Sequence, residues 1–91
     1  MNTMILRVLA QGEVYNVPSK KSENGQLAKC VIRLKELGEV GDEYLVTILG
    51  NMAQCRFPPD SIVAASLRFK VHESNGQFYQ DILANEIKPL K

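Results

Sequence analysis

The sequence predicts an all-β protein in which five strands close into a small Greek-key barrel. Three observations carry this prediction: apolar and polar residues alternate in most segments, an Asn-Gly pair separates two such segments, and only one short stretch favours a helix. Alternation with a period of two gives each strand one buried and one wet face, as a barrel requires. With 91 residues, 45% of them hydrophobic and 23% charged, the chain is expected to form one domain, residues 1–91.

The first predicted strand starts in residues 4–11 and continues past Gly12 to Tyr15. A glycine within a run of strand-forming residues indicates a bulge or bend, where a side chain would obstruct a neighbouring backbone. A long first strand bent in this way can serve both sides of a small barrel. The polar residues 18–25 that follow are expected to form a loop.

The second predicted strand covers residues 27–35. Its expected core-facing residues are Ala28, Cys30, Ile32 and Leu34, and its outward residues are Lys29, Val31, Arg33 and Lys35. After an acidic turn, residues 44–49 form a third strand that is apolar on both faces. We therefore expect a partner subunit, a loop or a ligand to cover its outer side. Residues 51–56 allow one or two helical turns before Pro58 and Pro59 end them.

The last third of the chain, residues 61–90, predicts a hairpin. In its first strand, apolar and basic side chains alternate: Leu67, Arg68, Phe69, Lys70, Val71 and His72. Asn75-Gly76 is a strong turn pair because both residues tolerate positive φ. Five strands, with at most one short helix between the third and the fourth, match the OB-fold, a five-stranded Greek-key barrel.

Composition argues against a metal site, an enzyme and a membrane protein. Cys30, Cys55 and His72 lack the spacing of metal ligands, so no metal or other cofactor is expected, and Cys30 is expected to be a buried reduced thiol. The sequence contains no motif for a catalytic triad or a phosphate loop. It also has no signal-peptide pattern and no apolar run near ~20 residues, so a cytoplasmic location is expected.

Several segments, taken in order, are similar to one known family. They are Arg7 to Val14, Asn24-Gly25, Glu43 to Ala53, Leu67-Arg68, Tyr79 to Asn85, Ile87 and Leu90. Together they resemble the bacterial single-stranded DNA-binding proteins. The resemblance implies an OB-fold that binds single-stranded DNA with little sequence preference, in replication, recombination or mobile-element DNA processing.

The chain departs from that family in three ways. It has no tryptophan, which the family generally uses for base stacking, and its segment 51–60 is short. It ends at Lys91 without the family's long linker and acidic tip. We therefore expect nucleic-acid binding without the family's usual recruitment of replication and repair proteins.

Binding of a single strand needs a cationic groove and flat side chains. The net charge is only +1, so such binding depends on where the charges lie; acidic residues gather in 36–43 and 81–86. The predicted nucleic-acid-binding residues are Lys20, Lys21, Lys29, Arg33, Lys35, Tyr44, Arg56, Arg68, Lys70 and His72. The alternative is that the basic residues are solvated strand faces that keep the sheet soluble.

The aromatic residues leave alternatives open. Tyr44 either stacks on a base or is a core tyrosine with a hydrogen-bonded hydroxyl. His72 either contacts nucleic acid or is an ordinary exposed histidine, and Phe57 is a stacking residue, a lid or an interface residue.

The apolar third strand and the small core predict a homodimer or homotetramer. Two alternative functions stay open beside single-stranded DNA binding. One is a protein-interaction or assembly subunit that uses the apolar third strand, and the other is an RNA-binding module.

Overall fold

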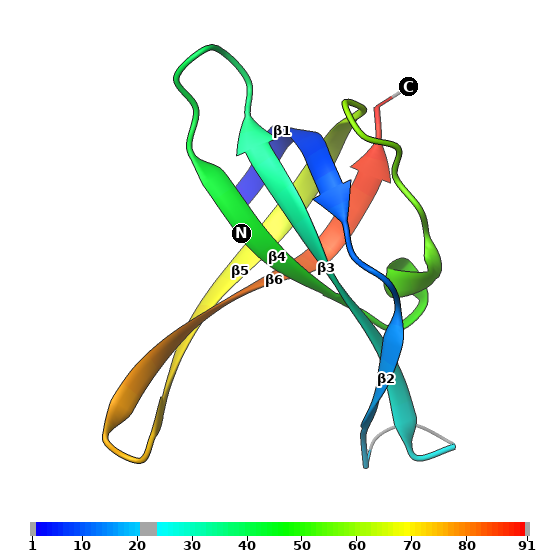
Figure 1. Ribbon diagram of the computed structural model, residues 1–91, viewed down its shortest axis with the longest axis vertical. Coiled ribbons are helices and arrows are strands. Elements are labelled where there is room, and N and C mark those ends of the chain that lie inside the picture. The colour runs from blue at the N-terminus through cyan, green and yellow to red at the C-terminus, as the bar shows by residue number, and fades with distance from the viewer. Residues whose placement is uncertain (1, 21–23, 91) are drawn as a thin grey trace.

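The computed structural model describes residues 2–20 and 24–90. Their elements are β1 (Asn2–Gln11), β2 (Tyr15–Pro18), β3 (Gln26–Glu36), β4 (Glu43–Leu49), the 3₁₀ turn η1 (Gly50–Gln54), β5 (Ile62–Ser74) and β6 (Gln77–Pro89). The strands form one sheet in the order β1-β5-β6-β4-β3-β2, and β1 also pairs with β3, which closes the ring (Figure 1). The predicted all-β barrel, with its short helical turn between the third and fourth barrel strands, is confirmed.

The long first strand is divided at Gly12 into β1 and β2, which both pair with β3. The Gly12 N–H donates to the carbonyl of Val31 at 2.8 Å. A Cβ on Gly12 would lie 3.3 Å from that carbonyl oxygen, which is closer than most side chains tolerate. The close approach of two backbones therefore explains the glycine, and it confirms the predicted bend. β1 and β2 together make up the first of the five barrel strands.

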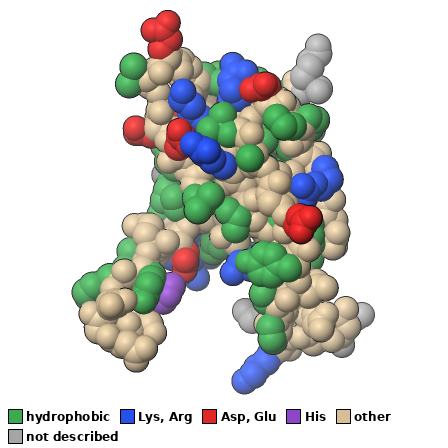
Figure 2. All heavy atoms as spheres, viewed as in Figure 1, with side chains coloured by type: hydrophobic (Ala, Val, Ile, Leu, Met, Phe, Trp, Pro, Cys, Tyr) green, Lys and Arg blue, Asp and Glu red, His purple; other side chains and the backbone are tan. Residues whose placement is uncertain are grey.

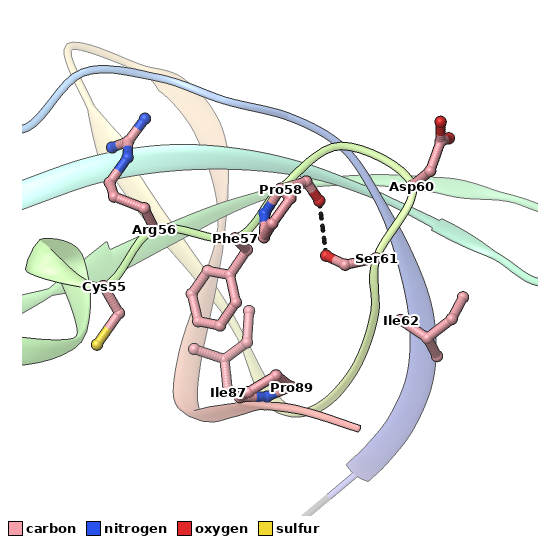
Figure 3. A pocket seen from close by; sticks show the side chains of 9 residues that line it. All are labelled: Cys55, Arg56, Phe57, Pro58, Asp60, Ser61, Ile62, Ile87 and Pro89. Carbon is pink, nitrogen blue, oxygen red and sulfur yellow. Dashed lines mark hydrogen bonds between the residues drawn. The ribbon is translucent and has the colours of Figure 1, made fainter. Parts of the chain in front are cut away.

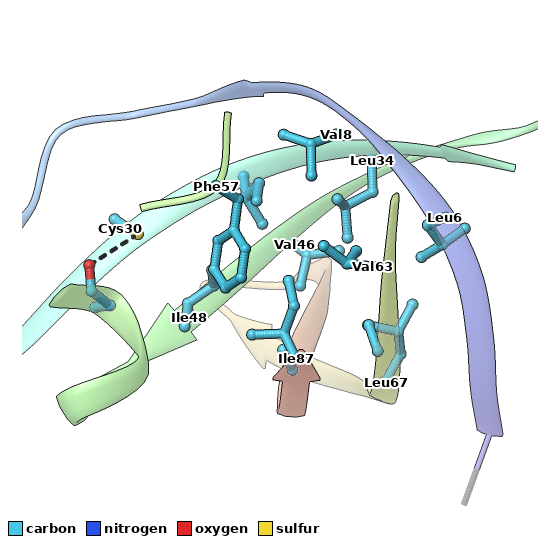
Figure 4. Close-up of a cluster of buried hydrophobic side chains, with 14 residues drawn as sticks. Leu6, Val8, Cys30, Leu34, Val46, Ile48, Phe57, Val63, Leu67 and Ile87 are labelled. Carbon is cyan, nitrogen blue, oxygen red and sulfur yellow. Dashed lines mark hydrogen bonds between the residues drawn. The ribbon is translucent and has the colours of Figure 1, made fainter. Parts of the chain in front are cut away.

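The core lies inside the ring (Figure 4). Its largest fully buried side chains are Leu6, Val8, Cys30, Ile32, Leu34, Val46, Ile48 and Val63. The alternation predicted for β3 is confirmed, because Cys30, Ile32 and Leu34 are buried and Arg33 between them is exposed. Cys30 is a free, buried thiol, as predicted. Phe57, which follows η1, is 7% exposed and belongs to this core cluster.

β5 and β6 extend well beyond the barrel as a two-stranded arm, residues 68–82. β1 pairs with β5 as far as Leu67, and β4 meets β6 at Leu83. Beyond these contacts, residues 68–81 are all exposed, and Figure 1 shows the β5–β6 ribbon projecting away from the barrel. Asn75 and Gly76 have φ values of 54° and 80° and form the predicted two-residue turn at the tip of the arm.

We predict that Leu34→Ala lowers the free energy of unfolding by about 2–5 kcal/mol, because it leaves a cavity in the closed core. Leu45→Ala is the matched control: it removes the same atoms from the neighbouring strand β4, where Leu45 is 67% exposed. Its effect should be about 0.5 kcal/mol or less. Urea unfolding followed by circular dichroism measures both, and equal losses would contradict the assigned interior of the barrel.

Candidate nucleic-acid interface

The register of the sheet places β3, β4, β6 and β5 on one continuous outer surface. Val31 of β3 points away from the core, because both of its neighbours in sequence are buried. Thr47 of β4 lies opposite Val31, and Leu83 of β6 lies opposite Thr47. Arg68 of β5 lies opposite Leu83. Since residues directly opposite each other share one side of a sheet, these four strands present a single outer face.

The outer face carries five of the predicted basic residues: Lys29, Arg33 and Lys35 on β3, and Arg68 and Lys70 on β5. Three carboxylates share this face: Glu43 lies opposite Lys35, Asp81 lies opposite Lys70, and the exposed Glu86 of β6 lies opposite Ser66. Basic side chains therefore outnumber acidic ones on this surface, although the whole chain is close to neutral. Leu45, Thr47 and Leu49 of β4 lie between the two basic groups.

Arg33 forms an ion pair within the outer face. Its Nε donates to Oε1 of Glu43 at 2.6 Å, and the two side chains are 56% and 43% exposed. This hydrogen bond lowers the pKa of Glu43 and raises the pKa of Arg33. The pair adds little to stability because water screens it, but a phosphate that binds Arg33 has to compete with Glu43.

Two projections flank the outer face, and Figure 2 shows an open hollow between them. One projection is the hairpin of β2 with the start of β3, and the other is the arm. Tyr15 of β2 lies opposite Lys29, so it shares the outer face, and it is 48% exposed. Lys20 is exposed in the connection after β2. The predicted contact at Lys21 falls outside the described residues.

The arm carries a stacked pair of rings on the outer face. His72 of β5 lies opposite Tyr79 of β6, and their ring centroids are 5.3 Å apart with planes at 20°. Nδ1 of His72 lies 3.0 Å from a carboxylate oxygen of Asp81, and the Tyr79 hydroxyl donates to Oε1 of Gln77 at 2.7 Å. Tyr79 is 44% exposed. The rings are thus held in orientation and stay accessible to a ligand.

Among these aromatic rings, the sequence predicts a role in binding for His72 but not for Tyr79 or Tyr15. A signal for Tyr79 was available, because the two-residue turn at Asn75-Gly76 sets the register of the hairpin. Counting outward from that turn places residue 72 opposite residue 79. Tyr15 offered no such signal, since its place beside Lys29 depends on the break at Gly12.

Tyr44, predicted as a stacking residue, points to the inner side of the barrel. It lies opposite Leu34, packs against the core cluster and donates its hydroxyl to Oε2 of Glu36 at 2.7 Å. That hydrogen bond and burial raise the pKa of Tyr44 to about 12. The structure thus matches the second alternative, a core tyrosine with a bonded hydroxyl, and we leave Tyr44 out of the interface.

Arg56 binds backbone rather than joining the basic groups of the outer face. Its guanidinium donates to the carbonyls of Gly12 at 2.9 Å and Gln11 at 3.4 Å, so it ties the segment after η1 to the bend in the first strand. Beside it lies a cavity of about 490 Å³, where Phe57 and Ile87 lie against each other (Figure 3). Phe57 therefore belongs to this cavity and to the core.

Residues 2–20 and 24–90 hold no group of three or more His, Cys, Asp or Glu side chains placed to bind a metal ion. Across the same residues, no helix is long and apolar enough to cross a membrane. Cys30 and Cys55 are both free thiols, the first buried and the second exposed.

No family model and no curated protein matches the sequence. Among solved structures, the chain is similar to the second OB-fold domain of replication protein A from Methanococcus maripaludis, determined by solution NMR. The TM-score is 0.73 at 17% sequence identity, and the match covers 98% of this chain and 82% of that one. The fold is an OB-fold. At this identity the likeness establishes the fold and does not single out the bacterial family that the sequence resembles.

We predict that Tyr44 ionises near pH 12 instead of at its usual value of 10.0, because its hydroxyl proton is bound by Glu36. Absorbance titration of the wild-type protein and of Tyr44→Phe isolates this ionisation as a difference between the two curves. Between pH 10 and 12 the folded state keeps a proton that the unfolded state has released, so the free energy of unfolding should fall as pH rises. The free energy of unfolding should fall less in Tyr44→Phe. An absorbance difference between the two proteins that is centred at pH 10 would contradict the hydrogen bond.

Proposed function

We propose that this protein binds single-stranded DNA with little sequence preference, along the outer face between the arm and the β2–β3 hairpin. One observation carries the proposal: basic residues from two strands far apart in sequence share one face, with exposed aromatic rings on both flanking projections. OB-folds that bind single strands combine these two features, a positively charged groove for the backbone and aromatic side chains for the bases.

In this proposal the basic side chains contact phosphates and the aromatic rings contact bases. The phosphate-binding residues are Lys20, Lys29, Arg33, Lys35, Arg68 and Lys70. Tyr15 and the His72–Tyr79 pair stack on bases at the two ends of the groove. Phosphates and the flat faces of bases are common to all sequences, so such contacts give affinity with little sequence preference.

A second candidate function is a protein-interaction or assembly subunit. Leu45 favours it, because this large apolar side chain is 67% exposed in the middle of the outer face. The two functions differ in what they require of the basic residues. Replacing basic residues of the outer face by acidic ones should abolish DNA binding if the protein binds single-stranded DNA. The same change should leave partner capture intact if the protein is an interaction subunit.

We predict that labelled oligo-dT binds the wild-type protein and that its affinity falls steeply with salt, measured by fluorescence anisotropy. Each neutralised phosphate contributes about −0.7 to the slope of log affinity against log salt for single strands. Lys29→Glu combined with Arg68→Glu should therefore flatten that slope by about 1.4 or more. At low salt the same double variant should lose more than about tenfold in affinity, since two attractive charges become repulsive.

Arg68→Glu is also measured alone, and its matched control is Lys88→Glu, which changes the net charge equally. Lys88 lies near the far end of β6, five residues beyond Leu83, and pairs with Glu86 at 3.2 Å. It should leave oligo-dT affinity nearly unchanged. Absence of wild-type binding at low salt would rule out the proposal, and tighter binding of oligo-U than of oligo-dT would favour the RNA-binding alternative.

We predict that Tyr79→Ala weakens oligo-dT binding by about 1–3 kcal/mol, which is about 5- to 150-fold, because one stacked base loses its platform. Tyr79→Phe is the control: it keeps the ring and loses only the hydroxyl that binds Gln77. It should bind within about twofold of the wild type. Wild-type affinity in Tyr79→Ala would show that the ring pair on the arm does not contact bases.

A further inference from the structure

The arm has a second face, opposite to the face that carries His72 and Tyr79. Its side chains are Phe69, Val71, Glu73, Phe78, Gln80 and Ile82, which lie opposite one another in pairs across the two strands. We call these six residues the apolar arm face. It continues the interior of the barrel, because the next pair in the ladder, Leu67 and Ala84, is buried in the core.

Apart from Ile82, which is half-buried against the core, this face is open to solvent. Phe69 is 44% exposed, Val71 63% and Phe78 74%. Contiguous exposed apolar patches on soluble proteins mark interaction sites when they are large. A two-stranded ribbon by itself is also only marginally stable in water. Contact with another molecule would therefore stabilise the arm.

Charges are segregated between the two faces of the arm. The opposite face holds Arg68, Lys70, His72 and Asp81. On the apolar arm face the one charged side chain is Glu73, next to the tip. The amide of Gln80 is turned back onto the ribbon, where its Nε2 donates to the carbonyl of Lys70 at 3.2 Å. Two such faces can thus approach each other along most of their length without bringing like charges together.

We propose that the apolar arm face packs against the same face of a second copy of this chain, forming a homodimer joined arm to arm. A twofold contact of this kind buries both stripes at once and uses one patch on each subunit. It leaves both basic outer faces turned away from the contact and accessible. A nucleic acid is a poor occupant, because the apolar arm face offers no cation for a phosphate. This inference does not rest on the proposed DNA binding.

The test is sedimentation equilibrium of the full chain without nucleic acid. The wild-type protein should sediment as a dimer at tens of micromolar, and Phe78→Asp should sediment as a monomer. Val71→Asp should act in the same way, and each should raise the dimer dissociation constant at least about 100-fold, because it places a carboxylate in an apolar contact. Both positions are solvent-exposed in the single chain, so circular dichroism should show an unchanged fold.

Tyr79→Asp is the matched control, since it puts the same charge one residue further along β6 on the other face. It should keep the dimer. A monomeric wild-type protein at 100 µM, a concentration on the order of that used for weak dimers, would overturn the proposal. So would a dimer that survives both Phe78→Asp and Val71→Asp. If an Asp variant loses its fold, sedimentation equilibrium is repeated with Phe78→Ser and Val71→Ser, which add no charge. These variants should also be monomeric, and a dimer that survives both would overturn the proposal.

Discussion

The arrangement of this protein depends on one parallel contact, in which Thr47 of β4 lies beside Leu83 of β6. With the double pairing of β1, to β5 and to β3, this contact closes the sheet into a ring. It also decides which side chains share a surface. Because β6 lies beside β4, the outward residues of β3 and β5 belong to one face, on which β4 and β6 lie between the two basic groups.

The long final hairpin has a different environment at each end. Near the barrel its inner side chains, such as Leu67 and Ala84, are part of the core. Beyond Leu67 none of the described residues adds a third strand to the ribbon, so the same alternation exposes an apolar face and a charged, aromatic face to solvent. One hairpin can in this way provide a wall for a groove on one side and a contact for a second subunit on the other.

Part of the candidate site could be predicted from the sequence, but the positions of Tyr44 and Tyr15 could not. The basic residues of β3 and β5 could be placed on outward faces because strand periodicity alone assigns sides. Tyr44 could not be placed, since the side on which β4 begins depends on its register with β3, where Tyr44 lies opposite the buried Leu34. Tyr15 joined the site only through the break in the first strand, where two backbones approach closely at Gly12.

The sequence by itself determined the strands, the bend at Gly12, the turn at Asn75-Gly76 and the inward residues of β3. These features follow from short-range causes: side-chain alternation, backbone freedom of glycine and asparagine, and the burial of apolar side chains. Only the tertiary structure decided which strands are neighbours around the ring, how far the arm extends beyond its support, and that Tyr15 joins the outer face beside Lys29. Those depend on contacts between segments far apart in the chain, and local periodicity carries no information about such contacts.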